Sequence, residues 1–310
     1  MRRIAFAVLL LATMASGQWL GEKLSLLDTF GIPAGYQSLA YNSRNQTVYL
    51  SGDKCDSIVV IDADRCKSIA RVGVGRPVGA MCFNPAENKL YCAYACAETV
   101  AVLDGTTHQM LAKVGVGGTA GTFCYDSLDN KMYVAHKRSA TVTVLDCGGD
   151  RVVATIGGVQ RDTTWLASRM CFAPAHKTVY ITSPLESSVV AIDCSADTVL
   201  ARIPAGRNPR AVCYNPTNDR VYCAAWGDSA GVYGIDARTN HVVSVVPRFG
   251  ATLACDPARN VLFVPDDMLA VVDCSTDTVL AEVELPEASG DLVGYDPVND
   301  KVYVAGGEPG

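Results

Sequence analysis

The strongest constraint on this chain is a repeat of about 42 residues that runs through nearly all of it. An aromatic-Asn/Asp-Pro/Ser element opens most units, as in Phe83-Asn84-Pro85 and Tyr214-Asn215-Pro216. The units open at positions 41, 83, 125, 172, 214, 255 and 295, so that successive starts lie 42, 42, 47, 42, 41 and 40 residues apart. A period of this length is typical of architectures in which each repeat buries its faces against its neighbours.

Two further landmarks recur in each unit. An aromatic residue follows every start by eight positions, and an Asp closes an apolar run in six of the units. The aromatic residues are Tyr49, Tyr91, Tyr133, Tyr180, Tyr222, Phe263 and Tyr303, and the aspartates are Asp62, Asp104, Asp146, Asp193, Asp236 and Asp273. Because Asp in this position can hydrogen-bond the backbone of a following turn, we interpret the repeated aspartates as structural.

Each unit divides into four short apolar segments separated by Asn, Asp, Pro and Gly clusters, which is the pattern of strands joined by turns. Four strands in this length match one propeller blade, and no segment has helical periodicity. We therefore predict an all-β fold, a seven-bladed β-propeller of four-stranded antiparallel blades. Its repeat units start near residues 38, 80, 122, 169, 211, 252 and 292.

The two ends of the chain are expected to share the seventh blade. The last unit reaches Gly310 where its third strand should begin, while residues 26–35 resemble a fourth strand and the turn after it. The sequence therefore offers no segment for the third strand of this blade. Either the blade has three strands, or residues 18–23 contribute to it, or the reading frame is truncated.

The repeat resembles the YVTN-type propeller repeats of surface-layer and YncE-like proteins. The matching pattern is Tyr-Asn-Pro, Lys-Val-Tyr-Val, Val-x-Val-Ile-Asp and Val-x-Ala-x-Ile-x-x-Gly, over roughly residues 24–310. The resemblance implies a circular array of four-stranded blades. It implies little about chemistry, because the functions of that family are varied.

The N-terminus has the features of a secretory signal. Arg2 and Arg3 precede an apolar stretch at residues 4–15, and small residues follow at 15–17. We expect a signal peptide at 1–17, a single propeller domain at 18–310, and export to the periplasm, the cell surface or the medium. No later segment approaches the ~20 apolar residues that a membrane-spanning helix needs. The net charge of -6 argues against nucleic-acid binding.

Thirteen cysteines lie beyond the predicted signal. Cys82, Cys124, Cys171 and Cys213 share one repeat position, which favours small buried side chains over designed pairs. The alternative is a bridge within a blade, between Cys82 and Cys92 or between Cys213 and Cys223, whose members are ten residues apart.

Several motifs that suggest chemistry have simpler explanations. Gly227-Asp228-Ser229-Ala230-Gly231 matches the nucleophile-elbow string, but no helix follows it. Gly115-Val116-Gly117-Gly118-Thr119-Ala120 precedes a strand, whereas a dinucleotide site needs a helix N-terminus. We interpret the four histidines as scattered solvated residues: His108, His136, His176 and His241.

One rim of the predicted propeller carries the candidate site. We call it the candidate rim; it comprises the loops between second and third strands and the connections between blades. Arginines and tryptophans there could hold a carboxylate, phosphate or sulfate. The alternative is that acidic residues of the same rim pair with the arginines or, more weakly, bind a metal. The candidate ligand-binding residues are Arg76, Arg161, Trp165, Arg207, Arg210, Trp226 and Arg248, and the acidic residues include Asp162, Asp228, Asp266 and Asp267.

The residues favour a non-enzymatic binding or scaffold module with no catalytic residue and no cofactor. Its expected partner is a protein or an anionic glycan or metabolite. The alternative is a propeller enzyme, either a metal-dependent lactonase or hydrolase or a cofactor-dependent oxidoreductase, with a site at the channel mouth. Such sites collect residues from several blades, so sequence spacing can hide them.

Overall fold

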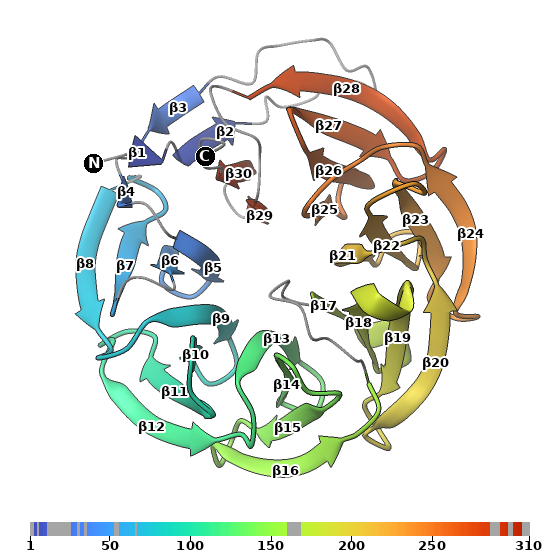
Figure 1. Cartoon of the computed structure of the whole chain (residues 1–310). Coiled ribbons are helices and arrows are strands. Elements are labelled where there is room, and N and C mark those ends of the chain that lie inside the picture. The colour runs from blue at the N-terminus through green and yellow to red at the C-terminus, as the bar shows by residue number, and fades with distance from the viewer. Residues whose placement is uncertain are drawn as a thin grey trace. The chain divides into compact units, whose positions relative to one another are not determined.

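In a computed structural model of the chain, the described residues are 3–4, 6–10, 26–29, 32–33, 36–52, 56–65, 67–159, 169–285, 292–296 and 300–305. They form two compact units. We call Gly35–Arg202 the four-sheet unit, and Met1–Ala34 together with Ile203–Gly310 the terminal unit. Each contains four-stranded antiparallel sheets (Figure 1).

The four-sheet unit holds four such sheets, and each corresponds to one sequence repeat. The first sheet contains β5 (Tyr36–Asn42), β6 (Thr47–Gly52), β7 (Ser57–Asp62) and β8 (Lys67–Gly73). The second contains β9 (Val78–Asn84), β10 (Lys89–Tyr94), β11 (Thr99–Asp104) and β12 (Met110–Gly115). The third contains β13 (Ala120–Asp126), β14 (Lys131–His136), β15 (Val142–Asp146) and β16 (Arg151–Ile156). The fourth contains β17 (Met170–Ala173), β18 (Thr178–Ser183), β19 (Ser188–Asp193) and β20 (Thr198–Pro204), with single 3-10 turns η1 (Pro174–His176) and η2 (Pro184–Glu186).

The terminal unit holds two sheets of the same kind and a third assembled from both ends of the chain. The first contains β21 (Pro209–Asn215), β22 (Arg220–Ala225), β23 (Gly231–Asp236) and β24 (His241–Val246). The second contains β25 (Ala254–Asp256), β26 (Val261–Pro265), β27 (Met268–Asp273) and β28 (Thr278–Glu284). The composite sheet has the order β29 (Leu292–Asp296), β30 (Lys301–Ala305), β2 (Phe6–Leu10) and β3 (Leu26–Thr29), and β1 (Arg3–Ile4) pairs with β4 (Ile32–Pro33).

The predicted count of seven blades needs correction. Six blades are built from four consecutive strands, whereas the last repeat supplies only β29 and β30. These two strands complete a sheet with β2 and β3 and do not form a blade of their own. β2 occupies the position for which the sequence offered no third strand, and it lies within the predicted signal peptide.

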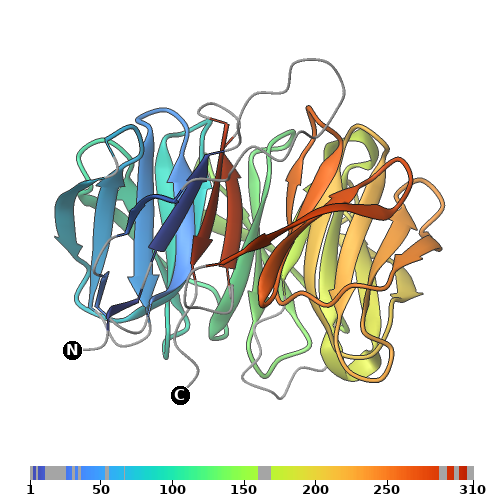
Figure 2. The same cartoon turned by 90° about the horizontal axis from the view of Figure 1, so that it is seen from above.

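The core of each blade lies in its second and third strands, which are buried on both faces. All six residues of β6 and β18 are buried, whereas β8 and β20 alternate between exposed and half-buried residues. This difference arises because the inner strands are covered by neighbouring sheets on both sides and the fourth strand is an outer edge. Figure 2 shows the same strands after the structure of Figure 1 has been turned about the horizontal axis, so that it is seen from above.

The repeated aromatic residues fill the interfaces between blades, as the period predicts. Tyr49, Tyr91, Tyr133, Tyr180, Tyr222 and Phe263 are all essentially buried. Burial of one such ring contributes roughly 1.5–3 kcal/mol.

The repeated aspartates cap turns, which confirms their structural role. In the turn after β11, Asp104 Oδ1 accepts hydrogen bonds from the backbone N–H groups of Thr106 and Thr107 at 2.9 and 2.7 Å. These bonds hold the pKa of Asp104 below its ordinary value. Many of the described hairpin turns also have a residue at positive φ, and Asn and Asp are the common choice because they tolerate this conformation. Examples are Asn88, Asn130, Asp150 and Asp197.

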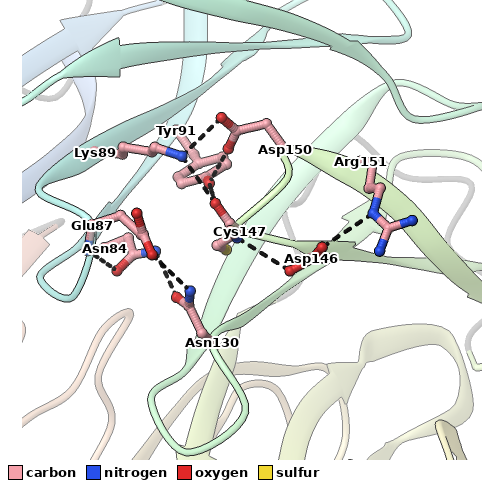
Figure 3. Close-up of polar contacts among 10 residues, drawn as sticks. Asn84, Glu87, Lys89, Tyr91, Asn130, Asp146, Cys147, Asp150 and Arg151 are labelled. Atoms are coloured by element: carbon pink, nitrogen blue, oxygen red, sulfur yellow. Dashed lines mark hydrogen bonds and ion pairs between the residues drawn. The ribbon is translucent and has the colours of Figure 1, made fainter.

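Hydrogen bonds from the second strand of one blade reach the turn of the next (Figure 3). Lys89 Nζ donates to the carbonyl of Cys147 at 3.0 Å and to Asp150 Oδ2 at 2.9 Å. Lys131 and Tyr133 make the same bonds to Cys194 and Asp197 one blade further on. At these two interfaces, charge-assisted contacts therefore join neighbouring blades in addition to apolar packing.

The two cysteine bridges that the sequence left as an alternative do not form, and the preferred interpretation as unpaired side chains agrees with the structure. Within its hairpin Cys82 lies opposite Tyr91, and Cys92 lies opposite Met81. The two thiols therefore point to opposite faces of the sheet, since neighbouring strand positions alternate. Cys213 lies opposite Tyr222, and Cys223 lies opposite Val212, in the same way. None of these four cysteines forms a disulfide.

Histidine 136 also departs from expectation, because it is buried and not solvated. Only 2% of His136 is exposed, and its Nε2 lies 2.8 Å from Thr143 Oγ1. Its Nδ1 has no hydrogen-bond partner among the described residues. Burial lowers the pKa of the imidazole.

Candidate functional site

The candidate site lies in the terminal unit, where β21 and β22 meet the loops that precede and follow them. Arg210 sits on a β-bulge: Pro209 pairs with Ala225 and Ala211 pairs with Ala224, so that Arg210 is the extra residue between them. A bulge turns the side chain of its extra residue away from the regular alternation. The bulge therefore determines where the Arg210 guanidinium lies.

The same bulge recurs in the four-sheet unit, and in two of its blades it carries glycine. It falls at Gly79 in β9 and at Gly121 in β13. A methyl group added at Gly79 would contact Ala95, and one added at Gly121 would meet the side chain of Lys137. Ala95 and Lys137 follow the second strand of their blades, as Trp226 follows β22. The bulge position and the position after the second strand are thus neighbours, and in this blade they hold Arg210 and Trp226.

The guanidinium of Arg210 stacks on the indole of Trp226. Its Cζ lies 3.6 Å from the ring centroid. Such a cation–π contact is worth roughly 0.5–2 kcal/mol, more when it is desolvated. Trp226 also contacts Phe249, with 5.5 Å between ring centroids and 41° between the ring planes. Phe249 thus supports the ring on which Arg210 lies.

Arg210 carries a charge with no acidic partner among the described residues. Its Nε is buried and accepts or donates no hydrogen bond there. Burial lowers the pKa of the guanidinium. A desolvated charge without a counter-charge is unfavourable, and stacking on Trp226 offsets only part of this cost. Arg210 is therefore a group that an incoming anion would satisfy.

The other arginines of this region are paired. Arg207 contacts Asp228 at 2.8 Å, but 68% and 89% of the two side chains are exposed. An exposed pair of this kind contributes about 0–1 kcal/mol and opens readily. Arg248 forms an ion pair with Glu282 of β28. Arg207 can therefore be shared with a ligand.

Backbone contacts fix the loops that carry these residues. The N–H of Trp226 donates to the carbonyl of Arg207 at 3.0 Å, and the N–H of Arg207 donates to Ser229 Oγ at 3.1 Å. The serine of the Gly-x-Ser-x-Gly string is thus engaged in holding the connection between blades.

Asp266 and Asp267 lie at the turn between β26 and β27. Burial and the neighbouring Asp267 raise the pKa of Asp266, while Arg248 partly offsets this. Among the described residues, no three His, Cys, Asp or Glu side chains are grouped as a metal site would need.

The predicted rim residues thus separate into three groups. The structure brings together Arg207, Arg210, Trp226 and Asp228, and it places Arg248 within electrostatic range of Asp266. Arg76 lies exposed in the four-sheet unit, on the connection between β8 and β9. Arg161, Asp162 and Trp165 lie outside the described residues.

Sequence reasoning missed Phe249 and Glu282. Phe249 had a usable signal, because aromatic residues are rare in the connections between blades. Glu282 had no such signal, because the sequence of its outer strand resembles those of the other outer strands. Its pairing with Arg248 depends on how the connection after β24 crosses β28.

No family model and no curated protein matches the chain. Among solved structures, hydrazine synthase of Kuenenia stuttgartiensis aligns with a TM-score of 0.74 and 18% identity, over 93% of this chain and 96% of that one. U3-55K aligns with a TM-score of 0.75 and 11% identity, over 90% of each chain. The fold is a β-propeller. At these identities the similarity extends to the fold alone.

Among the residues that the structure describes, no helix is long and apolar enough to cross a membrane.

Proposed function

We propose that this chain is an exported, non-enzymatic propeller that binds an anionic ligand at the Arg210–Trp226 cluster. The observation that carries the proposal is the stacked guanidinium of Arg210, which among the described residues has a buried Nε without a partner and no acidic neighbour to neutralise it. The planar fork of an arginine suits carboxylate, phosphate and sulfate groups, which it binds through two parallel hydrogen bonds.

Arg207 extends the site toward solvent. Its weak pair with Asp228 can give way to a ligand oxygen at little cost, because both side chains are already hydrated. Trp226, 42% exposed, offers a ring surface beside the charge. A ligand that combines an anionic group with a sugar or aromatic ring would use both features.

Export and kinship with YVTN-type repeats belong to the same proposal. Arg2, Arg3 and the apolar residues after them support a secretory signal, and the Tyr-Asn-Pro and Val-x-Val-Ile-Asp elements support the kinship. An exported protein meets carboxylated and sulfated glycans at cell surfaces, which fits the charge of the site.

An array of neutral, carboxylated, phosphorylated and sulfated glycans tests the proposal. The wild-type chain is expected to bind one or more anionic classes and none of the neutral counterparts. Arg210→Gln should weaken that binding about 10- to 100-fold, since a charge-assisted hydrogen bond is worth roughly 1.5–3 kcal/mol. Arg238→Gln, in the exposed turn after β23, is the matched control and should leave binding unchanged. Equal binding by wild type and Arg210→Gln would contradict the proposal.

A further inference from the structure

The first strands of successive blades bring a cysteine against an aromatic ring. In the four-sheet unit, Cys82 of β9 and Tyr125 of β13 pack against one apolar cluster. Cys124 of β13 and Phe172 of β17 do the same at the next interface. At both interfaces, the cysteine position of one blade and the opening aromatic position of the next therefore pack against the same cluster.

In the terminal unit the same arrangement brings two cysteines together. Cys213 holds the cysteine position of β21, and Cys255 holds the opening position of β25, where other blades carry Tyr or Phe. Both pack against the same buried cluster between the two blades. β21 and β25 are neighbouring strands (Figure 1). A thiol–aromatic contact is here replaced by a thiol–thiol contact.

We propose that Cys213 and Cys255 are a redox-active pair that forms a reversible disulfide between two blades. The oxidant is a small-molecule disulfide. One thiolate attacks a sulfur of the small disulfide, forms a mixed disulfide and releases one small thiolate. The second protein thiolate attacks the mixed disulfide, forms the Sγ–Sγ bond and releases the other. Two electrons pass to the small disulfide, and the two thiol protons end on its thiolates.

Accessibility distinguishes this pair from the other cysteines nearby. Cys213 and Cys255 are partly exposed, whereas Cys223 and Cys274 of the same two blades are buried. The pair is therefore more accessible to a small disulfide than the buried thiols of the same two blades are. Neither cysteine is bridged in the structure.

The electrostatics of the pair set its pH dependence. A hydrogen bond with the Cys213 thiol, together with burial, holds the pKa of Cys255 well above its ordinary value. Because the thiolate is the attacking species, exchange should be slow at neutral pH and faster in alkaline buffer. The pair is thus a slow redox site, suited to report a lasting change of environment.

The test uses the full chain, first reduced and then equilibrated with oxidised glutathione at pH 8.5, alkylated and digested with trypsin. Cys213 and Cys255 fall in separate tryptic peptides, 211–220 and 249–259, and each peptide contains one cysteine. Mass spectrometry should detect the two peptides joined, and reductant added before alkylation should separate them. The joined species should fall at least about tenfold in Cys213→Ser.

Matched variants make the result decisive. Cys223→Ser removes a buried thiol of the same hairpin and should leave the joined peptides unchanged. In Cys213→Ser, glutathione should remain attached to Cys255 as a mixed disulfide. The proposal is overturned if wild-type peptides 211–220 and 249–259 stay separate after equilibration. It is also overturned if either peptide links mainly to a different cysteine. Either outcome leaves anion binding at Arg210 unaffected.

Discussion

The hydroxyl of Tyr91 donates a hydrogen bond to Asp150 of the next blade, with 2.6 Å between the two oxygens (Figure 3). Lys89 holds the other oxygen of the same carboxylate. A buried ring, a lysine and a turn aspartate therefore act together at one interface. Tyr133, Lys131 and Asp197 repeat the arrangement at the next interface.

Tyr91→Phe should destabilise the chain by about 1.5–3 kcal/mol, because it removes a hydrogen bond to a charged acceptor. Tyr49→Phe is the matched comparison, since Tyr49 donates to the neutral carbonyl of Gly105 at 3.0 Å. Tyr49→Phe should lower the free energy of unfolding by about 1 kcal/mol. Urea unfolding followed by circular dichroism measures both. Equal losses of unfolding free energy in the two variants would show that the charge of the Asp150 carboxylate does not strengthen the hydrogen bond of Tyr91.

His136 should give the chain a pH-dependent stability. Because burial lowers the pKa of the folded imidazole, the unfolded chain binds the proton more readily. The contribution of His136 to the free energy of unfolding is then fully present above the unfolded pKa of about 6.5. It falls as the pH drops below that value, by at most ~1.4 kcal/mol per pH unit. Unfolding midpoints between pH 7.5 and 5 would record this decline.

His136→Gln should remove most of that decline, since glutamine can still contact Thr143 but does not titrate. His241→Gln, on the exposed first position of β24, is the matched control and should retain the wild-type profile. A wild-type profile that persists in His136→Gln would assign the pH dependence to other groups.

Asp228→Asn should strengthen anion binding by up to about fivefold, because it removes the competitor for Arg207 and the pair is worth no more than ~1 kcal/mol. Calorimetric titration with the anionic glycan that binds best would measure the gain. Asp267→Asn, at the β26–β27 turn, removes an equal charge from the same unit and serves as the comparison. An equal gain in both variants would indicate a general charge effect and no release of Arg207.

The repeat period explains why much of the fold could be predicted. A side chain that recurs once per blade, such as Tyr91, must face the same kind of neighbour each time, so its burial follows from its spacing alone. The structural role of the turn aspartates could be predicted for the same reason, because they too recur once per blade. Cys255 was not recognised because its importance depends on the blade that precedes it, one repeat earlier in the sequence.

The composite sheet was harder to predict. Residues 6–10 are apolar throughout, and a signal peptide and a strand buried on both faces share that composition. Apolar composition therefore does not separate the two. In the structure these residues pair with β30 and β3 as β2. Cleavage at the predicted site would remove this strand, so the intact mass of the exported chain is informative.

The candidate site was predicted in outline only. Spacing placed Arg210 and Trp226 on one rim, but their stacking depends on the bulge in β21, which adds one residue to the strand and turns the arginine toward the indole. A bulge of this kind has no marker in the sequence. In β9 and β13 it coincides with glycine, whereas here it holds Arg210.

The Nε–H resonance of Arg210 tests the central claim most directly, because this atom lacks a hydrogen-bond partner in the part of the chain that the structure describes. It can be followed in nitrogen-proton correlation spectra and assigned by its absence in Arg210→Lys. Titration with the anionic glycan should shift the Arg210 resonance saturably, with the same dissociation constant as calorimetry. An unmoved Arg210 resonance at saturating ligand would contradict the claim that Arg210 binds the anion.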